Sequence, residues 1–202
     1  MKLKALIVLF LMGSMSLTAQ KSYQLQSPDK KLQAVVTVGD DIRFSFTHDG
    51  TEVLAASPIS MTLQNGVVLG AGPKVSKVLK AAVDKVIPSP FYKKAEVSDI
   101  YNEMTISFRG DYSIAFRLYN DGLAYRFITR KKGEIVVADE AATYNFSTDH
   151  KTFSAYVNST KPTFEEQFSN SFEQPYVNEA ITKLNDKRLM ILPYLVDLGN
   201  GK

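Results

Sequence analysis

Four glutamates lie in a polar stretch in the last quarter of the chain: Glu165, Glu166, Glu173 and Glu179. Residues 157–176 of this stretch show no apolar alternation, and five aromatic residues lie in or beside them: Tyr156, Phe164, Phe168, Phe172 and Tyr176. Carboxylates beside aromatic rings are what a sugar site needs, because the acids move protons or bind a hard cation and the rings stack on a pyranose. The alternative is a solvated acidic loop that covers its own aromatics, and the residues by themselves favour it.

Other chemistry is sparse in this sequence. The histidines are His48, at the end of an expected strand, and His150, in a turn-like stretch after Asp149. No G-x-S-x-G elbow, H-E-x-x-H, P-loop, G-x-G-x-x-G or EF-hand loop occurs, which argues against the site classes that these motifs mark. The absence of cysteine excludes disulfides, thiolate metal sites and a cysteine nucleophile. The Arg109-Gly110-Asp111 tripeptide matches a cell-adhesion motif, but a hairpin turn explains it better.

Residues 1–19 have the layout of a secretory signal peptide. Lys2 and Lys4 precede an apolar run from Ala5 to Met12, and small residues lead to a cleavage site after Ala19. The run is shorter than the roughly 20 residues that a membrane-spanning helix needs. Removal of the two lysines lowers the net charge from +3 to +1, which leaves no electrostatic footprint for nucleic acid. We therefore expect a periplasmic protein with no membrane segment after cleavage.

Period-two alternation dominates the rest of the chain and predicts an all-β fold. Asp-Gly, Asn-Gly and Gly-Asp pairs separate the alternating runs, and such pairs tolerate the positive φ angles of hairpin turns. We expect hairpins at 42–48/51–56, 104–109/112–119 and 112–119/123–130. Further strands are expected at 31–38, 74–80, 134–139, 142–146 and 189–196, with at most two helical turns in 178–187. Many short strands with regular turns predict a large antiparallel β-sandwich.

Several segments together resemble the N-terminal domain of glycoside hydrolase family 97, which contains bacterial α-glucosidases and α-galactosidases. The most specific segment is residues 116–127, Phe-Arg-Leu-Tyr-Asn-Asp-Gly-Leu-Ala-Tyr-Arg-Phe. The others are residues 27–32, 57–59, 172–176 and 192–197, which contain Ser-Pro-Asp, Ser-Pro-Ile, Phe-Glu-Gln-Pro-Tyr and Leu-Pro-Tyr-Leu-Val-Asp. Their order and spacing cover nearly all of the chain after the signal peptide.

The resemblance implies a mutarotase-like sandwich that packs against a (β/α)₈ barrel carrying the catalytic carboxylates. It implies no catalytic residue in this chain and identifies no substrate-binding residue. It also implies calcium in the active site, for which the N-terminal domain supplies one glutamate, and the matching position is Glu173. The parent enzyme would hydrolyse terminal α-glucosidic or α-galactosidic bonds of an oligosaccharide, and the resemblance does not decide between the two sugars.

The C-terminal end of the sequence suggests a truncation. Asn200-Gly201 is a strong hairpin signal, yet one residue follows it. We expect a signal peptide at 1–19 and a sandwich domain at 20–202 that is incomplete at its C-terminus. The apolar strand at 189–196 would then have no return partner, and the isolated chain would associate or aggregate. The alternatives are a stand-alone periplasmic carbohydrate-binding sandwich and, more weakly, an adhesive β-domain.

Overall fold

A computed structural model describes residues 20–157, 163–169 and 173–199. The expected signal peptide and the Asn200-Gly201 turn lie outside these ranges. The strands form an almost purely β architecture, as predicted, and the expected helix at 178–187 is reduced to one short 3₁₀ turn. The elements are β1 (Lys21–Gln26), β2 (Leu32–Val38), β3 (Ile42–His48), β4 (Thr51–Leu63), β5 (Val68–Leu69), β6 (Val75–Pro88), β7 (Glu96–Phe108), β8 (Tyr112–Leu118), β9 (Leu123–Thr129), β10 (Val137–Ala142), β11 (Lys151–Tyr156), η1 (Glu165–Phe168), β12 (Val177–Ala180), η2 (Ile181–Lys183) and β13 (Met190–Asp197).

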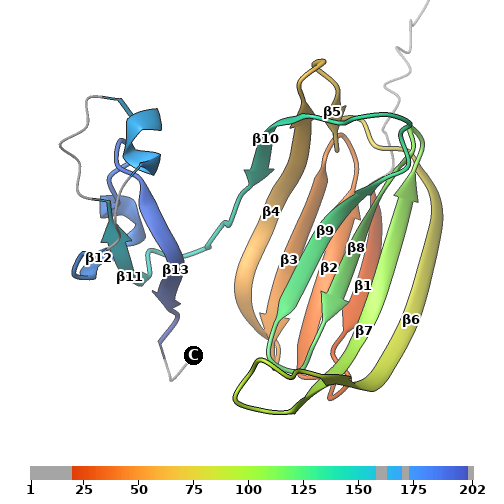
Figure 1. Cartoon of the computed structure of the whole chain (residues 1–202), viewed down its shortest axis with the longest axis horizontal. Coiled ribbons are helices and arrows are strands. Elements are labelled where there is room, and N and C mark those ends of the chain that lie inside the picture. The colour runs from red at the N-terminus through yellow and green to blue at the C-terminus, as the bar shows by residue number, and fades with distance from the viewer. Residues whose placement is uncertain (1–19, 158–162, 170–172, 200–202) are drawn as a thin grey trace, which may run out of the picture.

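The strands form three antiparallel sheets. The first sheet has the order β1-β2-β3-β4-β10, with β5 paired to β4, and the second sheet has the order β6-β7-β8-β9. These two sheets face each other as a sandwich (Figure 1). The third, which we call the small sheet, has the order β12-β11-β13 and is joined to β10 by the segment before β11 (Figure 1). Within the described ranges, no helix has the length and apolarity that a membrane crossing requires.

The core of the sandwich follows from the alternation in the sequence. Strand β2 buries every second side chain. Strand β8 directs Tyr112, Ile114, Phe116 and Leu118 into the same apolar core. Each such apolar side chain contributes about 1.5–3 kcal/mol when it is fully buried. The first and second sheets therefore share one continuous apolar interior, and that interior fixes which face of each strand is outward.

The turns confirm the predicted hairpins but change one register. Asp49 and Gly50 adopt φ angles of 48° and 73°, as a two-residue turn requires. Strand β7 ends at Phe108, so Arg109 joins Gly110 and Asp111 in a three-residue loop. The tripeptide is a hairpin loop, as expected.

The expectation that the strand at 189–196 lacks a partner is wrong. Strand β13 pairs with β11, with Lys151 opposite Asp197 and Tyr156 opposite Met190. Strand β11 was not predicted from the sequence, because Ser154, Ala155 and Tyr156 are all buried and this continuous burial breaks the alternation of a half-exposed strand. Strand β13 is nevertheless an edge of the small sheet, and Leu192 is 84% exposed.

Candidate functional site

Glu179 is the centre of a hydrogen-bonded network in the small sheet. It lies in β12 opposite Thr152 of β11, and its carboxylate accepts a hydrogen bond of 2.5 Å from the Tyr156 hydroxyl. That hydroxyl accepts the backbone N–H of Asn185 at 2.9 Å. Burial raises the pKa of Tyr156, and the hydrogen bond to Glu179 raises it further. The phenol therefore stays a neutral donor to this carboxylate.

Arg188 lies over the ring of the same tyrosine. Its guanidinium carbon lies 4.6 Å from the centre of the Tyr156 ring, and its Nη2 donates to the carbonyl of Val157 at 3.0 Å. Next to it, the buried Gln167 side chain donates to the Lys187 carbonyl at 3.2 Å and accepts the N–H of Leu189 at 3.0 Å. Sequence reasoning missed both Arg188 and Gln167, because no motif distinguishes a half-buried arginine or a buried amide from a surface one.

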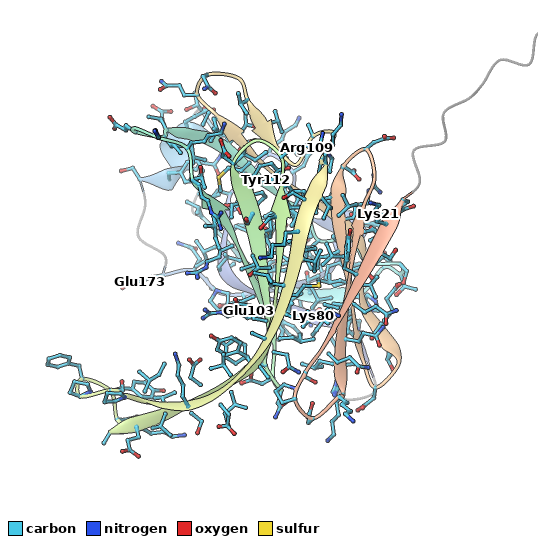
Figure 2. All side chains as sticks on the ribbon, turned by 90° about the vertical axis from the view of Figure 1, so that its right-hand side faces the viewer. Lys21, Lys80, Glu103, Arg109, Tyr112 and Glu173 are labelled. Atoms are coloured by element: carbon cyan, nitrogen blue, oxygen red, sulfur yellow. The ribbon has the colours of Figure 1, made fainter. Side chains whose placement is uncertain are left out.

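Glu173 stands apart from this network. It begins the extended segment before β12, its side chain is exposed, and it makes no hydrogen bond or ion pair with a described residue. Figure 2 shows it at the periphery of the molecule. A carboxylate in this state is free to accept a ligand from outside the domain.

The two remaining glutamates do not join Glu173 or Glu179. Glu166 accepts hydrogen bonds from the N–H and the hydroxyl of Thr163 at 3.2 and 3.1 Å, and its own N–H donates back to that hydroxyl. This reciprocal pattern has the hydrogen bonds of a capping box, although Thr163 lies one residue before Phe164, the N-cap of η1. Glu165 is exposed to solvent. The described residues contain no group of three His, Cys, Asp or Glu that could hold a metal ion, so any such site needs ligands from elsewhere.

The aromatic residues divide into two kinds. Tyr156 is buried in the network, whereas Phe164, Phe168 and Tyr176 are 44%, 63% and 52% exposed. Phe164 and Phe168 meet edge to face at 5.6 Å. Phe172 lies outside the described residues. The expectation that the loop covers its own aromatics is therefore wrong for these three rings, which remain available for contact.

The outer face of the second sheet carries a second polar cluster. Glu103 of β7 lies opposite Arg117 of β8, and the Arg117 Nε donates to the Glu103 carboxylate at 2.7 Å. The guanidinium lies 4.4 Å from the centre of the buried Tyr101 ring, which packs 5.0 Å from Tyr119. An open pocket of about 170 Å³ beside Arg117 is also lined by Ala115 and Arg126.

Sequence reasoning missed this cluster, although Arg117 and Tyr119 belong to the segment that carried the resemblance. The signal that could have found it is the strand register. A two-residue turn at Gly110-Asp111 would place Leu118, not Arg117, opposite Glu103, and only the three-residue loop pairs the two charges.

The histidines have local roles. The Nε2 of His48 lies 3.3 Å from the neighbouring Asp49 carboxylate, where the turn exposes both. His150 contacts the Thr148 hydroxyl at 2.7 Å, while Asp149 accepts the N–H and hydroxyl of Thr182 at 3.0 and 2.7 Å. These hydrogen bonds explain His150 and Asp149 without a catalytic serine.

Comparison with known proteins gives a consistent result over almost the whole chain. A family model described as "Glycosyl-hydrolase 97 N-terminal" matches residues 25–202. A retaining α-galactosidase from Bacteroides thetaiotaomicron is 42% identical over all 202 residues, which make up 30% of that protein. The chain thus spans less than a third of the curated relative that it matches.

Solved structures share the fold at lower identity. A glycoside hydrolase family 97 enzyme from Pseudoalteromonas sp. strain K8, in complex with panose, matches 85% of this chain and 26% of its own, with a TM-score of 0.68 and 19% identity. A β-arabinopyranosidase matches 77% of this chain and 26% of its own, with a TM-score of 0.63 and 22% identity. At these identities the likeness shows the fold alone.

Proposed function

This chain belongs to the glycosyl-hydrolase 97 N-terminal family, and from that premise we propose that it is the non-catalytic β-sandwich part of a secreted, calcium-dependent α-glycosidase. The parent enzyme cleaves terminal α-galactosidic or α-glucosidic bonds. The observation that carries the proposal is the 42% identity with a retaining α-galactosidase over all 202 residues. That identity favours the α-galactoside.

The catalytic groups belong to the part of the enzyme that this chain does not include. A retaining mechanism needs two carboxyl groups about 5–5.5 Å apart, one as acid and base and one as nucleophile. The described residues show a different chemistry: Glu179 and Glu103 are both engaged by hydrogen-bond donors within the domain. We assign the catalytic pair to a (β/α)₈ barrel in the remaining polypeptide.

Glu173 is the residue that we propose as a calcium ligand. Its carboxylate is exposed and free of described partners, which suits a hard cation that binds about six to eight oxygens. This domain offers one of those ligands, and the barrel supplies the others. Bound calcium would place a positive charge beside the substrate. As one of its ligands, Glu173 would bring this domain against the active site, where the domain would form part of the wall of the substrate pocket.

The first test is an activity assay of the 202-residue chain alone. We expect no hydrolysis of aryl α-galactosides or α-glucosides, because the catalytic pair is absent. A hybrid in which this chain replaces the matching 30% of the Bacteroides relative should hydrolyse the α-galactoside. Turnover by the purified chain itself would contradict the assignment of catalysis to the barrel.

The second test addresses the metal. In the hybrid, Glu173→Gln removes one charged ligand and should raise the calcium concentration needed for half-maximal activity. Glu165→Gln, an exposed neighbour, serves as the matched control and should leave the calcium requirement unchanged. Equal calcium titrations for the two variants would remove Glu173 from the site.

The exposed aromatics Phe164, Phe168 and Tyr176 favour a second candidate, a stand-alone carbohydrate-binding sandwich. In that case the isolated chain binds α-linked oligosaccharides, and Phe168→Ala weakens the binding. Calorimetric titration of the chain alone distinguishes the candidates, because a domain that needs its barrel shows no such binding.

A further inference from the structure

Strands β6 and β7 extend beyond the sandwich as a two-stranded arm. Strand β8 pairs with β7 only from Asn102 to Phe108, so Glu96–Tyr101 of β7 pair with Val83–Pro88 of β6 and with no other described strand. We call residues 83–101 the arm. Figure 2 shows this yellow-green ribbon curving away from the body of the sandwich.

The arm exposes an unusual amount of apolar surface. Its six exposed large hydrophobic side chains are Val86 (56%), Ile87 (42%), Phe91 (102%), Tyr92 (56%), Val97 (37%) and Ile100 (37%). Ile87 lies opposite Val97 on one face of the ribbon, while the neighbouring positions Val86 and Ile100 lie on the other face. Clustered exposed apolar side chains of this kind mark contact surfaces.

The root of the arm is held firmly. Lys80 Nζ donates to the Gln24 carbonyl at 2.6 Å, and Asn102 Nδ2 donates to the Gln26 carbonyl at 2.8 Å, which fixes β6 and β7 to β1. Further out, Lys85 pairs with the nearly buried Asp99 at 3.3 Å. An isolated two-stranded hairpin is marginally stable in water, so an apolar ribbon with an anchored root needs a surface that covers it.

We propose that this arm packs into an apolar groove of the catalytic portion of the parent enzyme, with Phe91 as the anchor; this inference rests on the proposed function. The chain accounts for 30% of the Bacteroides relative and 26% of the solved relatives, so most of the polypeptide able to cover the arm is outside it. Lys93 and Lys94 follow the two aromatics at the tip, which suits an acidic rim around the groove. Exposed aromatic side chains are typical interface anchors.

Photocrosslinking in the hybrid enzyme tests the docking. With p-benzoylphenylalanine at position 91, we expect a crosslink to the catalytic portion of the same polypeptide, identified by peptide mass mapping. Position 67, an exposed valine in the β4–β5 turn, is the matched control and should give no such crosslink. A crosslink between two copies, a crosslink within residues 20–199, or no crosslink at position 91 would overturn the proposal.

A stability measurement provides the second readout. Phe91→Ser should lower the Tm of the hybrid by several degrees and leave the Tm of the isolated chain unchanged, because the ring is fully exposed there. Val67→Ser should change neither. An equal loss in both proteins, or no loss in the hybrid, would count against docking. A hybrid that is inactive but crosslinks at position 91 would contradict the proposed activity and leave the docking supported.

Discussion

The two-sheet sandwich and the small sheet bury different kinds of side chain. Between the large sheets lie fully buried apolar residues such as Phe44, Ile106 and Phe116. The small sheet buries Ala155 but also polar groups: Thr152 and Ser154, with Gln167 of η1 beside them, and the hydroxyl of Tyr156 donates a hydrogen bond to Glu179. Apolar burial is non-directional, whereas a buried polar group requires its particular partner.

This difference shows where the domain is self-sufficient. The sandwich has an apolar interior enclosed by its own strands, so it needs no further surface to cover that interior. The small sheet leaves the buried Ser154 hydroxyl without a hydrogen-bond partner among the described residues, and it exposes Leu192 and Leu195 at 84% and 59%. We therefore expect the small sheet to be the less stable of the two regions in the isolated chain.

Removal of a core ring should have the largest effect. Phe116→Ala leaves a cavity in the fully enclosed interior and should cost about 3–5 kcal/mol of unfolding free energy. Urea denaturation measures this loss. Phe168→Ala, which truncates a ring that is 63% exposed, is the control and should change stability little. Similar losses for the two variants would contradict the contrast between the regions.

Removal of one hydroxyl in the small sheet should have an intermediate effect. Tyr156→Phe deprives Glu179 of its donor and leaves the Asn185 N–H without its acceptor, which should cost about 1–3 kcal/mol. Hydrogen exchange should accelerate in residues 151–156 and stay unchanged in residues 112–118. Tyr176→Phe, at an exposed ring, should alter neither segment, and acceleration across both sheets would mean that the two regions unfold together.

Disruption of the charged pair on the outer face of the sandwich should matter less. Glu103→Gln keeps the shape of the side chain but removes its charge beside Arg117, whose side chain is 33% exposed. Solvent screening limits the expected loss to about 0.5–1 kcal/mol, and added salt should reduce it. Asp41→Asn, which weakens a more exposed pair with Arg43, should have a still smaller effect in thermal denaturation.

The smallest effect should come from Asp149 and depend on pH. The hydrogen bonds from Thr182 lower the pKa of this exposed carboxyl in the folded state. A lowered folded pKa gives stability that is present above the unfolded pKa and lost as pH falls through the folded pKa. Asp149→Asn should therefore destabilise the small sheet slightly at pH 6 and hardly at pH 2. Asp186→Asn, at another exposed carboxyl, is the control and should leave the stability unchanged at both pH values in the same denaturation series.

The sequence predicted the sandwich better than the small sheet, and for a physical reason. Strands that are buried on one face alternate visibly, so the hairpins β3–β4, β7–β8 and β8–β9 could be located from their side chains. Strand β1 was missed because it buries only Leu25, and β11 was missed because its last three residues are all buried. Both lack the half-buried pattern that alternation detects.

The polar sites were harder to predict, because they depend on register and long-range pairing. The contact between Glu103 and Arg117 follows from the length of one loop. The contact between Tyr156 and Glu179 follows from the pairing of β11 with β12, which no local motif encodes. Glu173 was selected by resemblance alone, and its role as a metal ligand stays a prediction.

The order of the strands also has a consequence for how the chain folds as it is synthesised. Hairpins link β2 to β4 and β6 to β9, and the first sheet is completed when β10 pairs with residues 59–63 of β4. All strands of both large sheets have therefore been synthesised once residue 142 is added, whereas the small sheet must wait for β13 at residues 190–197. Because synthesis proceeds from the N-terminus at about 5–20 residues per second, we expect the sandwich to form its pairings while the small sheet is still being translated.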